Sequence, residues 1–154
     1  MVVGPDVVWI DLVVPAGIGP IGAVMGDVRR SMVWAGERWR DALVEVGVPR
    51  DRLAVHTAGL VETAWSSLVC FAGSGPGEVF LDGRKLVGLS QRRTRLGTRI
   101  QGQLHRSGSL AAMPALFAPP TPDAALGDAA EWPPVVAADL VEALARSEGR
   151  IDVH

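Results

Sequence analysis

The stretch from residue 78 to residue 105, EVFLDGRKLVGLSQRRTRLGTRIQGQLH, constrains the fold more than any other part of the chain. It divides into three short runs rich in apolar and β-branched residues, separated by DGR and by TRLG. An Asp-Gly pair readily adopts the positive φ angles that a two-residue hairpin loop requires. The sequence therefore predicts an antiparallel meander of three strands joined by tight turns.

Upstream of the meander, the pattern predicts one strand, one long helix and two further short strands. Residues 6–15, DVVWIDLVVP, are rich in β-branched residues and end at a proline, which predicts a buried strand. Residues 24–47 place apolar side chains at three- to four-residue spacing and end at Gly47, which predicts an amphipathic helix lying on a sheet. The apolar runs at 53–61 and 66–73 predict short strands.

Downstream of the meander, the chain changes character. It becomes rich in alanine and is interrupted by APPTPD and EWPPV, with one helix expected at 135–147. We therefore expect a globular unit over residues 1–105 and a Pro-interrupted helical C-terminal extension over residues 106–154. The order of the elements predicts an α+β fold, with a mixed, largely antiparallel sheet and helices packed on one face.

Composition and charge narrow the class of protein. A chain of 154 residues with 48% apolar residues is long enough for one domain with a substantial core. The net charge of −2 gives no overall attraction to nucleic acid, although six of the fifteen cations fall between Arg84 and Arg99.

The sequence has no run apolar enough to span a membrane and no signal peptide pattern, so the expected location is the cytoplasm. One cysteine excludes an internal disulfide, and three histidines without ligand spacing predict no structural metal.

Lys85 is the only lysine in the chain, because the rest of the fifteen Lys and Arg residues are arginines. A lone lysine among arginines suggests a site that requires a compact ammonium to polarise an electrophile; the alternative is a solvated strand end. Gly88 in the same strand either admits a ligand or marks a bulge. Strand alternation puts Gly88, Ser90 and Arg92 on the face opposite Lys85, so these four residues line one surface only if the strand bulges.

Cys70, in the segment LVCFAG, has two interpretations. Among apolar neighbours it fits a small buried hydrophobic residue. Alternatively, its thiolate is a nucleophile that carries an acyl group as a thioester, with Lys85 of a neighbouring strand assisting. The sequence lacks G-x-G-x-x-G, P-loop and serine-hydrolase patterns. No motif therefore supports a dinucleotide-binding, P-loop NTPase or serine-hydrolase function.

The segments GRKLVGLSQRRTR and IQGQL resemble the catalytic domain of the biotin/lipoate protein ligase family, which includes lipoate-protein ligases and octanoyltransferases. The family pattern is a Gly-Arg-Lys-apolar-x-Gly-Ser-[Ala/Ser] stretch, then an arginine-bearing hairpin and a strand that contains Gln/His-Gly. Looser similarity extends back through CFAGSGPGEV to GPDVVWIDLVVP, so the resemblance covers residues 2–106.

This resemblance implies a lipoate-protein ligase-like enzyme. Such an enzyme uses ATP and Mg²⁺ as substrates, without a tightly bound cofactor, to convert lipoate or octanoate to an acyl-adenylate. It then transfers the acyl group to a lysine of a lipoyl carrier domain, of the 2-oxoacid dehydrogenase or glycine cleavage H protein type. The resemblance implies that Lys85 contacts the acyl carbonyl and adenylate oxygens, and that Gly88, Ser90 and Arg92 lie beside the ligand.

The chain departs from the family at its N-terminus. It starts after the position of the family's Arg-Arg-x-Gly-Gly-Gly loop, so we expect residues 1–105 to be a partial catalytic domain, either inactive alone or completed by a second chain. The dipeptide Cys70-Phe71 matches one branch of octanoyltransferases, which gives the alternative of an ATP-independent transferase with a Cys70 thioester. Two further hypotheses are a non-catalytic remnant and a phosphate-binding nucleic-acid module. The last is disfavoured because the meander has a single aromatic residue, Phe80, for base stacking.

Overall fold

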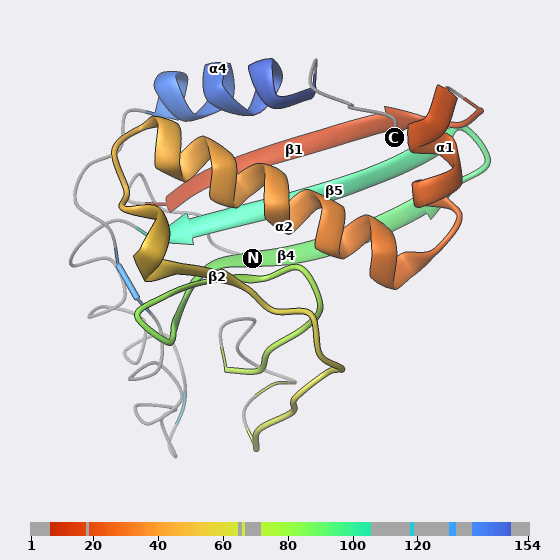
Figure 1. Ribbon diagram of the computed structural model, residues 1–154. Coiled ribbons are helices and arrows are strands. Elements are labelled where there is room, and N and C mark those ends of the chain that lie inside the picture. The colour runs from red at the N-terminus through yellow and green to blue at the C-terminus, as the bar shows by residue number, and fades with distance from the viewer. Residues whose placement is uncertain are drawn as a thin grey trace.

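The computed structural model describes residues 7–17, 19–64, 66, 72–105, 118, 130–131 and 137–148. Helices and strands alternate early in the chain and strands dominate its middle (Figure 1). The elements are β1 (Val7–Pro15), α1 (Gly19–Met25), α2 (Val28–Glu45), the 3₁₀ helix η1 (Arg50–Arg52), β2 (Leu53–Val55), β3 (Val79–Leu81), β4 (Arg84–Thr94), β5 (Gly97–His105) and α4 (Ala137–Glu148).

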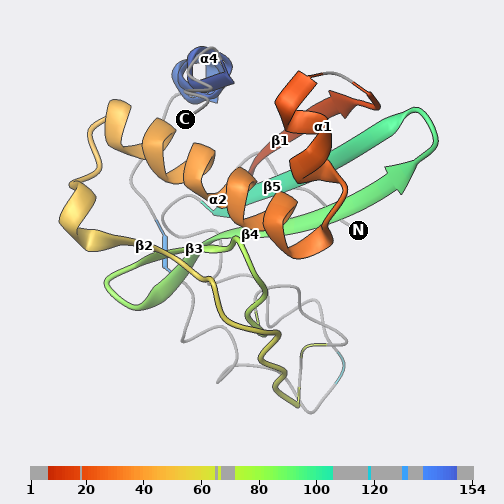
Figure 2. The ribbon, with the colours of Figure 1, turned by 45° about the vertical axis from the view of Figure 1, so that its right-hand side comes forward.

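The five strands form one sheet in the order β1-β5-β4-β3-β2. Every pairing between the described strands is antiparallel. The helices lie on one face of this sheet, and α2 runs across it (Figure 2). The predicted α+β fold with helices on one face is therefore confirmed, but the expectation of a mixed sheet is wrong for the strands that the structure describes.

The predicted meander is confirmed as β3, β4 and β5. Asp82 and Gly83 form the two-residue turn between β3 and β4, with φ angles of 50° and 77°. Positive φ angles at both positions give a turn whose twist matches that of the two strands it joins. The second turn, Arg95–Leu96, joins β4 to β5.

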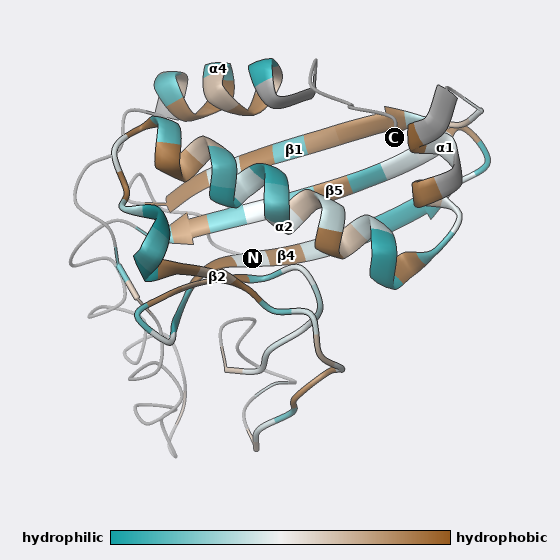
Figure 3. Ribbon diagram, viewed as in Figure 1, coloured by the Kyte–Doolittle hydropathy of each residue, from teal (hydrophilic) through white to brown (hydrophobic). Residues whose placement is uncertain are grey.

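Among the strands that the structure describes, β1 lies at the edge of the sheet, whereas its composition predicts a buried strand. Among the described strands it pairs only with β5. Val8, Leu12 and Val14 are buried, but the side chain of Val13 is 63% exposed. Figure 3 shows β1 as apolar along almost all of its length. β-branched residues fit a pleated strand whether one face or both faces are covered, so composition alone could not reveal the uncovered face.

The helix predicted over residues 24–47 is confirmed as α2, but it begins later than expected, because residues 24 and 25 belong to a separate helix, α1. α1 ends at Met25, and α2 starts at Val28 after Asp27, whose side chain accepts a hydrogen bond from the backbone N of Arg30 at 2.9 Å. An aspartate in this position is a preferred N-cap, which explains the break. Gly47, with φ of 103°, follows the end of α2 as predicted.

The two short strands predicted before the meander are mostly wrong. The run at 53–61 is a strand only over Leu53–Val55, and Val61 forms an isolated bridge with Ser74. The run at 66–73 contains no strand among its described residues, and its residues 67–71 lie outside the described part of the chain.

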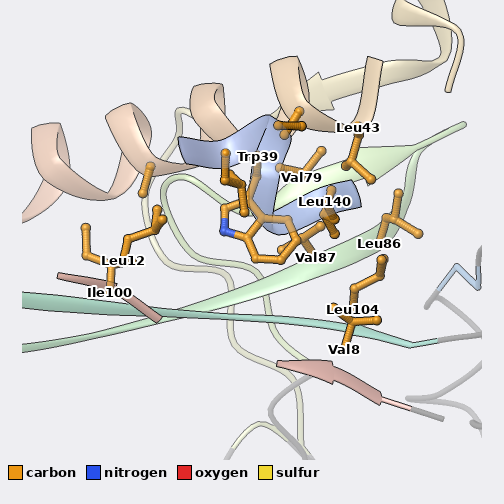
Figure 4. Close-up of a cluster of buried hydrophobic side chains, with 14 of the residues drawn as sticks. Val8, Leu12, Trp39, Leu43, Val79, Leu86, Val87, Ile100, Leu104 and Leu140 are labelled. Carbon is orange, nitrogen blue, oxygen red and sulfur yellow. The ribbon is translucent and has the colours of Figure 1, made fainter. Parts of the chain in front are cut away.

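The core lies between the sheet and α2 and includes the fully buried indole of Trp39 (Figure 4). A Cβ atom on Gly102 of β5 would lie 2.2 Å from the Trp39 ring, so the indole can rest on β5 only because residue 102 is a glycine. The glycine of the IQGQL segment therefore has a packing role in this chain.

The helix predicted at 135–147 is confirmed as α4. It lies beside α2, and its Leu140, Ala143 and Leu144 are buried in the same core as Trp39. The division of the chain at residue 105 stays a prediction, although α4 packs against the elements that precede that residue.

Candidate functional site

One extra residue in β4 decides which side chains share the face of the sheet that points away from α2, here called the outer face. Val79 pairs with Val87, but Phe80 already pairs with Lys85, so Leu86 is the extra residue of a β-bulge. Leu86 and Val87 are both fully buried in the core. The bulge therefore leaves Lys85 on the outer face, opposite Phe80, which alternates with the core residue Val79.

The bulge brings together the residues that strand alternation had separated. Gly88 follows the buried Val87 and lies on the outer face, and so do the alternate residues after it. One face of the sheet therefore carries Lys85, Gly88, Ser90 and Arg92. Strand alternation allows these residues to form a shared site only under this condition. The register across the hairpin is Gly88↔Gln103, Ser90↔Gln101 and Arg92↔Arg99.

Lys85 and Arg92 lie at opposite ends of this surface. Seven residue steps of extended strand separate them, which corresponds to roughly 20 Å between their Cα atoms. The two side chains can therefore contact the two ends of one extended ligand, but they cannot contact the same atom.

The Lys85 side chain is buried, and its ammonium contacts two groups in the segment before β3. Nζ lies 2.7 Å from Oε1 of Glu78 and donates a hydrogen bond to the carbonyl oxygen of Gly73 at 2.8 Å. Oε2 of Glu78 accepts a hydrogen bond from the backbone N of Gly75 at 2.9 Å. Because the side chains of Lys85 and Glu78 are only 3% and 7% exposed, these contacts offset the loss of water around both charges.

Two opposing effects act on the Glu78 carboxyl. Burial raises its pKa, because the charged form loses its hydration, whereas the ammonium of Lys85 and the hydrogen bonds from Lys85 and Gly75 lower it. The net direction of the pKa is upward, although the 2.7 Å contact is that of an ion pair. Without Lys85, only the hydrogen bonds from the backbone of Gly75 and Leu89 would oppose the effect of burial on this pKa, so the charge state of Glu78 depends on Lys85.

The segment that carries Gly73 and Glu78 is fixed to α2 by a contact between backbones. A Cβ atom on Gly36 of α2 would lie 1.9 Å from the carbonyl oxygen of Gly77, and one on Gly77 would lie 2.0 Å from that of Met32. Gly77 also has a φ of 88°, which side chains disfavour. α2 therefore sets the position of Glu78, the next residue, and through it that of the Lys85 ammonium.

Sequence reasoning missed Glu78. It stands directly before the apolar run VFL, on the opposite arm of the Asp82-Gly83 hairpin from Lys85. A lone acid at the start of a buried strand, four residues before such a turn, was the available signal. The hairpin register would have placed it near the lysine.

His105, at the end of β5, was also missed as a member of this region. It is 2% exposed, and its Nε2 lies 3.0 Å from Nε2 of Gln103. Burial lowers the pKa of His105, and the charge of Glu131 acts in the opposite direction. The backbone N of Ala130 donates to the carbonyl oxygen of Lys85 at 2.6 Å, which brings the chain at Glu131 close to Lys85.

The basic cluster of the meander is divided between the two faces of the sheet. Arg93 lies on the α2 side, where Nη1 donates to the carbonyl oxygen of Gly26 at 3.2 Å. Arg99 lies on the outer face, with Nη1 3.6 Å from Oδ2 of Asp11. The cations therefore do not form one continuous patch, as strand alternation predicts.

The remaining predictions concern Cys70, a metal site and membrane-spanning segments. Cys70 lies outside the described residues, so its role stays a prediction. Within the described part, no group of three His, Cys, Asp or Glu side chains could hold a metal ion. None of the described helices is long and apolar enough to cross a membrane.

Comparison with known proteins gives a likeness of fold. No protein-family model matches the chain, and no curated protein matches it significantly. Among solved structures, it is similar to a protein from T. acidophilum, a "putative lipoate protein ligase" solved with bound lipoic acid, with a TM-score of 0.60 and 11% sequence identity. The similarity covers 92% of this chain and 50% of the other, so the chain spans about half the length of that protein. At this identity the likeness establishes that the two proteins share a fold, as the resemblance in sequence implied.

Proposed function

We propose that the chain carries the acyl-carbonyl site of a lipoate-protein ligase-like enzyme. In this reaction lipoate or octanoate reacts with ATP to form an acyl-adenylate, and the acyl group then passes to a lysine of a lipoyl carrier domain. The observation that carries the proposal is the ammonium of Lys85, which Glu78 and Gly73 hold on the same face as Gly88, Ser90 and Arg92. The shared fold with a lipoate-bound protein supports it.

Lys85 acts as a fixed hydrogen-bond donor in this mechanism. When the amine of the carrier lysine attacks the acyl carbon of the acyl-adenylate, negative charge grows on the carbonyl oxygen. AMP then leaves with the electrons of the broken bond between the acyl carbon and the phosphate oxygen, and the attacking nitrogen releases a proton to water. One positioned donor stabilises such charge by about 3 kcal/mol. Glu78 and Gly73 hold the ammonium in position before a ligand binds.

The neighbouring residues have simpler roles. Gly88 has no side chain and so leaves room for the acyl group on the strand. Ser90 and Arg92 lie further along the same face and contact the part of the ligand that is distant from the carbonyl. Glu78 is a positioning residue, because it acts on the ligand only through Lys85.

The direct test is acylation of a carrier domain. The chain, as given and extended upstream of Met1, is incubated with ATP, Mg²⁺, octanoate and a lipoyl domain, and the mass of the lipoyl domain is measured. We expect a gain of one octanoyl group that requires ATP and is lost in Lys85→Arg. Arg93→Gln, a change on the opposite face of the same strand, should retain activity. Failure of both forms to make adenylate or modify the carrier would exclude the ligase function.

A Cys70 thioester transferase is the second candidate. It is favoured by the hydrogen bond from Lys85 to Gly73, which stands three residues after Cys70 in the sequence. The Cys70 thiolate would attack the thioester of an octanoyl carrier protein, whose thiol would leave as the acyl group moved to Cys70. Intact mass measurement without ATP should then show an octanoyl adduct on Cys70. Unchanged transfer by Cys70→Ser rules this mechanism out.

A further inference from the structure

Two arginines stand directly opposite each other on the outer face. Arg92 of β4 pairs with Arg99 of β5, and both residues are exposed. Side chains in such a pair start about 5 Å apart, and like charges directly opposite each other destabilise a sheet. An anion held between the two guanidinium groups would remove this repulsion.

The surroundings of the pair supply hydrogen-bond donors and one competing carboxylate. Ser90 and Gln101 form the next row towards Lys85. Asp11 of β1 lies 3.6 Å from Arg99 and accepts hydrogen bonds from Gln101 at 3.2 Å and from Trp9 at 3.1 Å. Among the described residues, the Arg92 guanidinium forms no ion pair or hydrogen bond. The two cations are therefore only partly neutralised by the protein itself.

We propose that Arg92 and Arg99 bind the pyrophosphate portion of a nucleoside triphosphate, an inference that rests on the proposed ATP-dependent activation. Guanidinium groups bind phosphate oxygens through paired N–H donors. The Cα atoms of Lys85 and Arg92 are separated by roughly 20 Å, and two long side chains reduce the gap between the charges to on the order of 10 Å. This separation suits a ligand with its acyl carbonyl at Lys85 and its terminal phosphates at the arginine pair.

The proposed contact stabilises the leaving group of the first step. The carboxylate oxygen of lipoate or octanoate attacks the α-phosphorus, and the bond between this phosphorus and the bridging oxygen to the β-phosphorus breaks. Pyrophosphate leaves with the bonding electrons, and its additional negative charge is formed between Arg92 and Arg99. Asp11 competes with this anion for Arg99, so loss of the Asp11 charge should strengthen binding.

The test is a titration of backbone amide signals by NMR at fixed ionic strength, with inorganic pyrophosphate, inorganic phosphate and AMP as separate ligands. Pyrophosphate should shift the amides of Arg92, Arg99 and Gln101 saturably. Arg92→Gln and Arg99→Gln should each raise the Kd by at least about fivefold, through loss of a charge-assisted contact. Asp11→Asn should lower the Kd. Arg93→Gln removes the same charge from the α2 side and should leave the Kd within about twofold.

The outcomes separate this proposal from the ligase function, because the titration contains neither acyl substrate nor carrier. Equal weakening by Arg93→Gln, or no saturable shift at the arginine pair, would overturn the proposal even if the chain proves to be a ligase. Equal affinity for inorganic phosphate and AMP would overturn the assignment to pyrophosphate. Specific pyrophosphate binding by a chain without ligase activity would leave the anion site in place and remove only the proposed reaction.

Discussion

At the residue scale, the ion pair between Lys85 and Glu78 affects both the stability of the protein and the proposed reaction. Both side chains are almost fully buried, and each offsets the desolvation of the other. Removing one partner leaves the other without its compensating charge, whereas removing both replaces an ion pair by neutral groups. The pair should therefore behave as a unit in stability measurements.

Lys85→Met should lower the free energy of unfolding by about 3 kcal/mol, because Glu78 is then buried alone. The double variant Lys85→Met/Glu78→Gln should lose less than the single variant Lys85→Met. Urea unfolding of the wild type, both single variants and the double variant measures this coupling. Additive effects of the two substitutions would contradict the ion pair.

His105 predicts a pH dependence of stability. Burial lowers its pKa in the folded state below the ordinary value of 6.5, against the opposing charge of Glu131. The unfolded chain therefore takes up a proton first as the pH falls, so the stability contributed by neutral His105 is present above pH 6.5 and is lost towards the lower folded pKa. His105→Gln should flatten the dependence of the urea midpoint on pH between about pH 7 and pH 5. An unchanged slope in His105→Gln, with His56→Gln as the matched control, would contradict this assignment.

The sequence identified Lys85 as unusual but not its partner. The signal for Lys85 was compositional, because every other cation counted is an arginine. Glu78 is one acid among many, and its importance depends on burial, which a single sequence does not show. His105 was missed for the same reason, because it is buried beside Gln103 and is affected by the charge of Glu131, which lies in a distant segment of the chain.

At the element scale, the site depends on two departures from regular structure. The bulge at Leu86 places Lys85 on the outer face, and the close contact of Gly36 with Gly77 holds the segment before β3 against α2. Alternation along β4 revealed that a bulge was needed. It could not show whether the bulge exists, because a bulge depends on how β3 pairs with β4.

Because of the contact between Gly36 and Gly77, replacing Gly36 by alanine should change stability in the direction opposite to that expected from helix propensity. Gly→Ala in a helix normally stabilises by about 1 kcal/mol. Gly36→Ala should instead destabilise the protein, because its Cβ would lie 1.9 Å from the Gly77 carbonyl oxygen. Gly22→Ala in α1 is the control, since its nearest neighbour would be 3.8 Å away, and it should be neutral or stabilising. Thermal unfolding decides between them, and a stabilised Gly36→Ala would contradict the contact.

At the scale of the whole molecule, the sheet order and the position of α4 define one core. The meander and the helices on one face followed from local patterns of turns and periodicity. The edge position of β1 and the packing of α4 against α2 did not, because they depend on which elements meet across long stretches of chain.

The position of α4 predicts how the C-terminal segment contributes to stability. Leu144→Ala should cost about 2–4 kcal/mol, because this side chain is 2% exposed and its loss leaves a cavity in the core. Val141→Ala on the same helix should cost much less, since Val141 is 48% exposed. Equal effects in urea unfolding would show that α4 does not belong to the core.

The proposed contact between Lys85 and the acyl-adenylate can be measured directly, because of the composition of the chain. Because Lys85 is the only lysine, protein labelled with ¹⁵N at the lysine side chain gives one ammonium signal. We predict that octanoyl-sulfamoyl-adenosine, a stable mimic of the adenylate, shifts this signal saturably in the wild type and in Arg93→Gln. A Lys85 signal that does not move at saturating concentrations of the mimic would contradict the account.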